Sequence, residues 1–143
     1  MSYQNGAFDW VTIPAGFCWL GTDLHIDSVA AANPWFRQVE VPQHQTYVET
    51  FKITRFPITN WQWGIFLANS NYEWQDRNKL WGDGMPANQE NHPVVWVNWY
   101  DAIAFCTHFG VYLPSEAQWE KASRGLDKRL YHCVDSQPTP ELS

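Results

Sequence analysis

The stretch HPVVWVNWYDAIAFCTHFGVYLPSEAQWEKASRG, from His92 to Gly125, carries the start signals of two helices and the short link between them. Asn98 and Asp101 have the spacing of a capping box, in which each side chain bonds the backbone N–H of the other residue. Ser115 and Gln118 repeat this spacing. The stretch therefore predicts that one helix begins after Asn98 and a second after Ser115.

The same stretch predicts where both helices end. Gly110 and Gly125 stand where the residue that terminates a helix belongs, and Glu120 and Arg124 are spaced to pair across one turn of the second helix. An apolar run from Pro93 to Val97 precedes the first helix and suits a short central strand. The first helix is expected to bury side chains at helical spacing: Trp99, Ala102, Ile103, Cys106 and Phe109.

Two stretches nearer the N-terminus have the alternation of strands. Phe8 to Pro14 and Phe17 to Leu20 are separated by a Pro-Ala-Gly turn, so the pair is predicted to form a hairpin. Gln45 to Ile53 alternates again and predicts one strand. One face of that strand would hold Tyr47, Glu49, Phe51 and Ile53.

A further helix is expected from about Asn60 to Asn69. Thr59 and Gln62 form a third capping box at its start. Gly64 lowers the helix propensity by about 1 kcal/mol relative to Ala, which suggests close packing at that position. The helix is expected to bury one side made of Trp61, Ile65 and Ala68.

A long polar loop with aromatic residues, from Asn71 to Asn91, follows this helix. Loops of this length are uncommon and are often functional. Tyr72, Trp74 and Trp81 either form a surface for a ligand or partner, or attach the loop to the core, and the second interpretation is favoured. They are the candidate site residues of the chain.

Length and composition bound the class of protein. The chain has 143 residues, enough for one domain, and its ten Trp, eight Phe and six Tyr predict an aromatic core or binding face. A net charge of −6 argues against a nucleic-acid partner. No apolar run approaches the ~20 residues that span a membrane, and the first residues do not resemble a signal peptide. We therefore expect a cytoplasmic protein without a membrane contact.

The cysteines are Cys18, Cys106 and Cys133, far apart and without a metal-ligand spacing. Reduced thiols are expected, with Cys106 in the core. The loop after the first strands holds three candidate ligands, Asp23, His25 and Asp27, which are interpreted as part of a solvated loop. The residue types of a hydrolytic triad are present in Asp101, His108 and Ser115, but helix capping explains the first and third. No metal site and no catalytic residue are predicted.

Three separate motifs resemble the sulfatase-modifying-factor family, whose best-known members are formylglycine-generating enzymes. They are VTIPAGFCWLGTD at 11–23, PQHQTYVETFKITRFPITNWQWGIFL at 42–67, and PVVWVNWYDAIAFCTHFGVYLPSEAQWEKASRG at 93–125. The resemblance covers roughly residues 9–131 in the order of the family. Ergothioneine-type sulfoxide synthases also contain this domain, but their iron-binding histidine pattern is absent here.

The resemblance implies an α+β fold of the C-type-lectin-like class, with mainly antiparallel strands, two or three short helices and much loop. Residues 1–131 are expected to form a partial domain of this type, and residues 132–143 a flexible tail. Family domains continue for about as long again. The calcium-binding loops and the cysteine pair that binds copper lie in that part, so no cofactor is expected in this chain, which is interpreted as truncated.

None of the three cysteines stands at the catalytic motif of the family. The expected function is therefore a non-catalytic, lectin-like module that binds a protein or peptide or acts as a scaffold. The alternative is an N-terminal fragment of a copper-dependent formylglycine-generating-type oxidase, completed by another segment or chain. Tryptophan side chains left uncovered by the absent half would form an apolar patch, so we expect a partner chain or a homo-oligomer to cover it.

Overall fold

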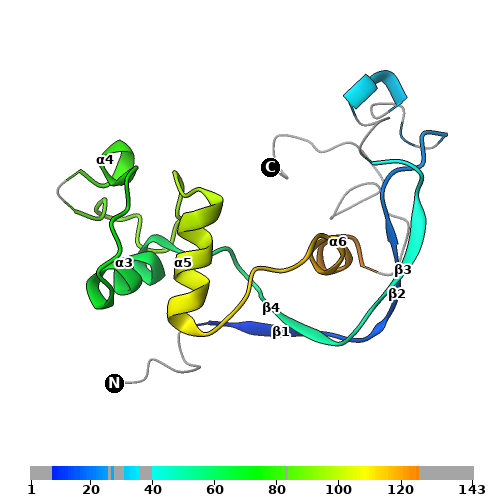
Figure 1. The fold of residues 1–143 in the computed structure, drawn as a ribbon. Coiled ribbons are helices and arrows are strands. Elements are labelled where there is room, and N and C mark those ends of the chain that lie inside the picture. Colours follow the sequence, from blue (N-terminus) through cyan, green and yellow to red (C-terminus); the bar gives the residue numbers. More distant parts are fainter. Residues whose placement is uncertain (1–7, 26, 28–30, 36–39, 83, 126–143) are drawn as a thin grey trace. The chain divides into compact units, whose positions relative to one another are not determined.

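The computed structural model of the chain describes residues 8–25, 27, 31–35, 40–82 and 84–125 (Figure 1). The strands are β1 (Trp10–Ile13), β2 (Gly16–Leu20), β3 (His44–Val48) and β4 (Phe51–Thr54), and the helices are α3 (Asn60–Asn69), α4 (Arg77–Leu80), α5 (Trp99–Phe109) and α6 (Glu116–Arg124). This composition is α+β. No helix among these residues is long and apolar enough to cross a membrane.

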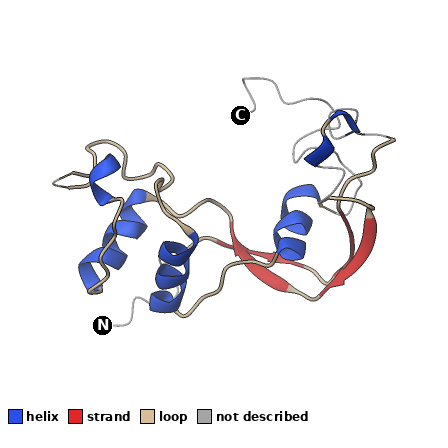
Figure 2. Ribbon diagram, turned by 45° about the horizontal axis from the view of Figure 1, so that its top comes forward, coloured by secondary structure: helices blue, strands red, loops and turns tan. Residues whose placement is uncertain are grey.

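The chain divides into two compact units. Unit 1 comprises residues 1–11 and 54–113, and unit 2 comprises residues 12–53 and 114–143. Unit 1 contains the helices α3, α4 and α5, whereas unit 2 contains α6 beside the strands β2 and β3 (Figure 2). The expected tail at 132–143 lies outside the described residues.

Strand pairing differs from the sequence-based expectation. The predicted hairpin of residues 8–14 with 17–20 is wrong, because β1 pairs with β4 and β2 pairs antiparallel with β3. The chain changes direction between β1 and β2, where Gly16 has a φ of 148° and the N–H of Ala15 donates to Thr50 Oγ1 at 3.0 Å.

The single strand predicted from Gln45 to Ile53 is also wrong. Glu49 and Thr50 separate β3 from β4, so each strand pairs with a different partner. In β3 the covered face is the one opposite Tyr47, since Tyr47 is exposed and Val48 is buried. Val48 lies opposite Gly16, on the side of the ribbon where Cys18 is buried. The alternation of apolar and polar residues predicts a strand but does not determine which of its two faces is buried.

Unit 1 has an aromatic core. The buried cluster consists of Trp63, Phe66, Trp74, Trp81 and Phe105. The rings of Trp63 and Phe105 are stacked, with centroids 5.4 Å apart and an interplanar angle of 10°, which joins α3 to α5. Gly64 packs against Trp81, since a Cβ on it would lie 3.4 Å from the Trp81 ring, at the near limit of van der Waals contact. The close packing predicted at this glycine is confirmed.

Helix α3 has the predicted bounds but a different buried face. Asn60, Trp63 and Phe66 are buried, whereas Trp61 and Ala68 are exposed. In α5, Asp101, Phe105 and Cys106 are the buried residues, and Trp99 is exposed. Both helices are apolar around much of their circumference, so helical spacing alone allowed more than one face.

The local signals at the helix ends are confirmed. All three capping boxes are formed, at Thr59, Asn98 and Ser115. Gly110 follows α5 in a left-handed conformation, with φ 68° and ψ 33°. Gly125 follows α6, and the ion pair between Glu120 and Arg124 is present.

The strand predicted from Pro93 to Val97 is wrong. Instead of a strand, the segment has an isolated bridge between Thr59 and Pro93, and the Val94 N–H donates to the Ile58 carbonyl at 2.9 Å. Val95 and Trp96 are exposed, and the backbone turns at Trp96, whose φ is 62°. This turn directs the Trp96 carbonyl to the indole of Trp74, which donates to it at 3.1 Å.

Candidate functional site

The three aromatic residues singled out in the sequence belong to the packing of unit 1. Trp74 and Trp81 are buried and Tyr72 is half-buried. The Trp74 ring meets the rings of Trp63 and Trp81 edge-on, at centroid distances of 5.6 and 5.4 Å. This is the arrangement expected of side chains that attach the loop to the core. A ligand or partner surface at these residues stays a prediction.

Tyr72 forms a polar contact at the start of α5. Its hydroxyl donates to Asp101 Oδ1 at 2.7 Å, and Asp101 Oδ2 accepts from the backbone N–H of Asn98 at 2.7 Å. Burial, together with the hydrogen bond to Asp101 and the negative charge of Asp101, raises the pKa of Tyr72 to about 12. The predicted role of Asp101 as a helix-start group is confirmed, and both of its oxygens have a partner.

The backbone N–H groups in the first turn of α3 donate to carbonyl groups of the same chain. The backbone N–H of Asn60 donates to the His92 carbonyl at 2.9 Å, and that of Trp61 to the Glu90 carbonyl at 3.0 Å. The Asn60 side chain donates to the Gln89 carbonyl at 2.9 Å. The donors of this helix start are therefore not available to an anionic ligand. No sequence signal identified residues 89–92 as their partner.

The two described thiols are both free and buried. Cys18, 1% exposed, donates its thiol to the Thr46 carbonyl at 3.6 Å, and Cys106 is 8% exposed on α5. Burial raises the pKa of both thiols, and the nearby Lys121 charge offsets part of the effect at Cys18. The prediction of reduced thiols is confirmed for these two residues, whereas Cys133 lies outside the described part.

The candidate ligands of the loop after β2 form a local turn. Asp23 Oδ1 accepts from the His25 N–H at 2.9 Å, and the Asp23 carbonyl accepts from the Asp27 N–H at 2.9 Å. Across the described ranges, no group of three or more His, Cys, Asp or Glu side chains is placed to hold a metal ion.

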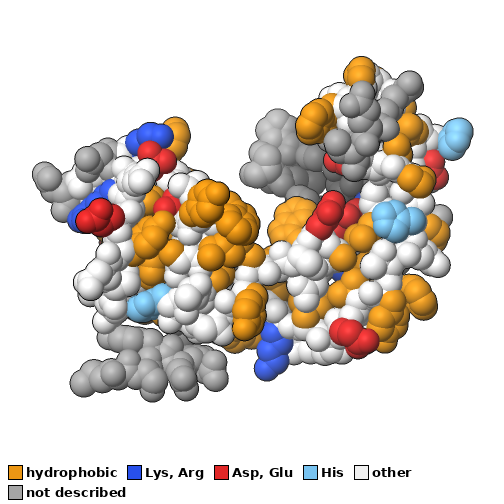
Figure 3. Space-filling model, viewed as in Figure 1, with side chains coloured by type: hydrophobic (Ala, Val, Ile, Leu, Met, Phe, Trp, Pro, Cys, Tyr) orange, Lys and Arg blue, Asp and Glu red, His pale blue; other side chains and the backbone are white. Residues whose placement is uncertain are grey.

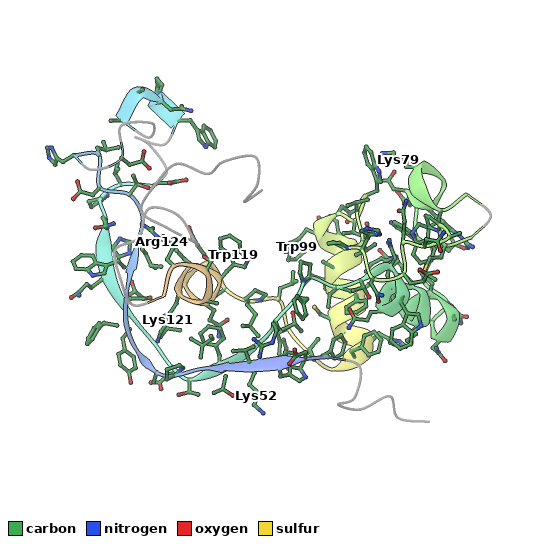
Figure 4. All side chains as sticks on the ribbon, turned by 180° about the vertical axis from the view of Figure 1, so that it is seen from behind. Lys52, Lys79, Trp99, Trp119, Lys121 and Arg124 are labelled. Carbon is green, nitrogen blue, oxygen red and sulfur yellow. The ribbon has the colours of Figure 1, made fainter. Side chains whose placement is uncertain are left out.

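Lys121 is a buried charged residue of unit 2 whose hydrogen bonds connect α6 to the strands. The side chain is 2% exposed, and its ammonium donates to the carbonyls of Pro14, Gly16 and Val48 at 2.7, 3.0 and 3.3 Å. Three acceptors satisfy the three N–H groups of a lysine. Figure 4 shows Lys121 extending from α6 on the side of the strands, with Trp119 elsewhere on the helix. This role is not predictable from the sequence, because lysine is ordinarily a surface residue.

Two further side chains of α6 hold the end of β2. Glu120 Oε1 accepts from the Gly21 N–H at 3.2 Å, and Arg124 donates to the Gly21 carbonyl at 3.0 Å. Gly21 has a φ of 79°, and a Cβ on it would lie 2.6 Å from the Glu40 carbonyl oxygen. Only glycine therefore fits at this position without a shift of backbone.

Comparison with known proteins decides the family. Residues 2–142 match the sulfatase-modifying factor enzyme 1-like domain. The chain belongs to this family. Its relatives include the uncharacterised protein YfmG of Bacillus subtilis, 33% identical over 128 residues, which is 80% of this chain and 25% of that protein.

Two other relatives in the family have named activities. The formylglycine-generating enzyme of Mus musculus is 48% identical over 50 residues, which is 34% of this chain and 13% of that enzyme. The hercynine oxygenase of Mycolicibacterium thermoresistibile is 28% identical over 153 residues, which is 87% of this chain and 33% of that enzyme. The chain thus spans a third or less of each of these three relatives.

Proposed function

We propose that this chain provides a non-catalytic part of the family's domain, with a C-type-lectin-like fold, and acts as a scaffold or as a protein- or peptide-binding module. The observation that carries the proposal is the placement of Cys18 and Cys106. Each is buried inside the packing of its own unit, and burial raises the pKa of each thiol. Reactive thiols instead have lowered pKa values and partial exposure.

The resemblance places the copper-binding cysteine pair of the family outside the motifs matched here, and Cys18 and Cys106 do not take its place. Soft sulfur ligands select Cu(I), and a cysteine binds metal as the thiolate. Cys18 and Cys106 favour the protonated form and are closed to solvent. We therefore assign them to packing and derive no oxidation step through them.

An assay of aldehyde formation tests the proposal. The purified chain is incubated with copper, oxygen and a cysteine-containing sulfatase peptide, and aldehyde is detected with an aminooxy probe. We expect no product above a sample without protein, while a formylglycine-generating enzyme under the same conditions serves as the positive control. Sustained conversion of the peptide by this chain alone would refute the non-catalytic assignment.

A second candidate is an N-terminal part of a copper-dependent formylglycine-generating-type oxidase that another segment or chain completes. It is favoured by the 48% identity to the mouse enzyme over 50 residues. The discriminating experiment is co-expression with the polypeptide encoded directly downstream, followed by the same assay. Aldehyde in the combined sample, but not with either chain alone, would favour this candidate over the first.

A further inference from the structure

Unit 1 buries three polar atoms that form no hydrogen bond with the described part of the chain. They are Asn60 Oδ1, Trp63 Nε1 and Trp81 Nε1. The three residues are only 1%, 2% and 7% exposed. A buried donor or acceptor without a partner costs about 1–3 kcal/mol, and native proteins contain few of them. Three in one unit therefore call for a ligand that completes their hydrogen bonds.

Burial sets these two indoles apart from other tryptophans of the same unit. Trp61 and Trp99 are exposed, and hydrophobic side chains reach the surface on the face seen in Figure 3. An indole N–H at the surface can donate to bulk solvent. The N–H groups of Trp63 and Trp81 lie inside the unit, so whatever accepts from them has to be bound there.

All three atoms belong to residues on one side of α3. Asn60, Trp63 and Gly64 have the i, i+3 and i+4 spacing of neighbours on a helix. The Trp81 ring covers Gly64, 3.4 Å from where a Cβ would stand. The Trp74 ring meets the rings of both Trp63 and Trp81 edge-on. The amide and the two indoles thus share one region of the core.

The orientation of the Asn60 side chain is fixed by its other bonds. Its backbone N–H donates to the His92 carbonyl at 2.9 Å, and its side-chain Nδ2 donates to the Gln89 carbonyl at 2.9 Å. A flipped amide would put its oxygen against that carbonyl oxygen, and neither atom can donate. Asn60 Oδ1 is therefore the atom that needs a donor.

We propose that this side of α3 is a buried hydration site, in which water accepts from the indole N–H groups of Trp63 and Trp81 and donates to Asn60 Oδ1. Water offers two donors and two acceptors, and buried waters typically make about three hydrogen bonds to polar groups that otherwise have none. Two donors and one acceptor match this capacity. The inference goes beyond the proposed function and does not depend on it.

Other occupants explain fewer of the three atoms. An indole N–H can donate to the face of an aromatic ring, and Trp74 lies beside both indoles. A ring face cannot donate to Asn60 Oδ1, so this contact would leave the amide without a partner. A charged ligand would lose its hydration among the aromatic rings, at a high cost in free energy. Water is small and neutral, and it both donates and accepts.

NMR of the full chain labelled with ¹⁵N-tryptophan tests the proposal. The experiment measures cross-peaks between water and the indole protons in the rotating frame, where proximity is distinguished from hydrogen exchange. The indole protons of Trp63 and Trp81 should each show a cross-peak to a long-lived water. Trp74 is the matched control, because it is buried in the same cluster but donates to the Trp96 carbonyl at 3.1 Å. Its indole proton should show none.

A pair of asparagine variants tests the acceptor. Asn60→Ala removes Oδ1, so the water cross-peaks of Trp63 and Trp81 should lose intensity. Asn69→Ala is the control on the same helix: the Asn69 side chain also donates to a backbone carbonyl, that of Ile65 at 2.8 Å, but it is exposed. This variant should leave both cross-peaks unchanged. Circular dichroism establishes that each variant is folded.

Several results would overturn the proposal. One is a wild type in which neither buried indole has a water cross-peak, which requires no variant to fold. Another is an equal cross-peak at Trp74. Indole protons of Trp63 and Trp81 that are shifted upfield and contact ring protons instead of water would assign both donors to ring faces. Cross-peaks that persist undiminished in folded Asn60→Ala would remove the amide, and with it the proposed site.

Discussion

Lys121 lies inside unit 2 with its ammonium group bonded to the carbonyls of Pro14, Gly16 and Val48. A buried charge is tolerated when hydrogen bonds replace its hydration. The three acceptors come from the start of β2, the turn before it and the end of β3, so one side chain fixes segments that are distant in sequence. The interaction is structural, since every N–H of the ammonium has an acceptor within the unit.

Replacement of Lys121 by Met should lower the free energy of unfolding of unit 2 by about 2–4 kcal/mol, because three buried carbonyls lose their donor. Urea denaturation measures the change. Lys52→Met is the control: Lys52 is exposed on β4 and points away from the strands in Figure 4, so its effect should stay within about 0.5 kcal/mol. Equal effects of the two variants would contradict the role assigned to Lys121.

Tyr72 predicts a dependence of stability on alkaline pH. Its pKa rises from the ordinary 10.0 to about 12 in the folded chain, so the folded state favours the protonated phenol. The stabilisation is therefore fully present below pH 10 and is lost as the pH rises through about 12.

The measurement compares the free energy of unfolding of wild type and Tyr72→Phe between pH 8 and pH 12. At pH 8 the variant should be less stable by about 1–2 kcal/mol, since Asp101 Oδ1 loses its donor. The difference should shrink as the phenol ionises. Tyr112→Phe, at an exposed position, should show no such change, and a constant Tyr72→Phe difference across this range would disprove the linkage.

At the scale of elements, the contacts from Glu120 and Arg124 to Gly21 fix where β2 leaves the sheet. Gly21→Ala should cost at least about 3 kcal/mol, because a Cβ would meet the Glu40 carbonyl oxygen at 2.6 Å. Gly110→Ala is the comparison: Gly110 is also left-handed, but a Cβ on it would meet nothing within 4 Å. Its cost should be about 1 kcal/mol. Thermal or urea unfolding of both variants distinguishes them, and similar costs would argue against the steric clash.

The helix ends were predictable from sequence, whereas strand pairing was not. Capping at Thr59, Asn98 and Ser115 depends on residues three positions apart, so a local pattern is sufficient. The pairing of β2 with β3 joins Leu20 to His44, which are 24 positions apart in the sequence, and alternation carries no information about the partner. The buried faces of α3 and α5 were similarly set by tertiary contacts between aromatic side chains.

The candidate site was predictable only in part. Composition pointed to an aromatic core, and the order of three motifs identified the family, which the match over residues 2–142 confirms. The buried role of Lys121 was not predicted, because its acceptors are backbone carbonyls, which no sequence motif identifies. Tyr72 was selected for its ring, while the structure shows its hydroxyl bonded to Asp101.

At the scale of the whole molecule, the chain joins two compact units, and each has a buried cysteine that serves packing. The chain belongs to a family that includes formylglycine-generating enzymes and hercynine oxygenases. Because both cysteines are buried, we expect Cys18 and Cys106 to be protected from modification and from metal binding in the folded chain.

Thiol modification of a Cys133→Ser variant tests this claim most directly, because only the two described cysteines remain. A thiol reagent should react with them in the native protein only as fast as the units open, and should react at the rate of a free thiol once urea has unfolded the chain. A copper(I) chelator competition on the native variant should show no binding by the chain. Rapid native labelling of either cysteine, or tight copper(I) binding, would contradict the account.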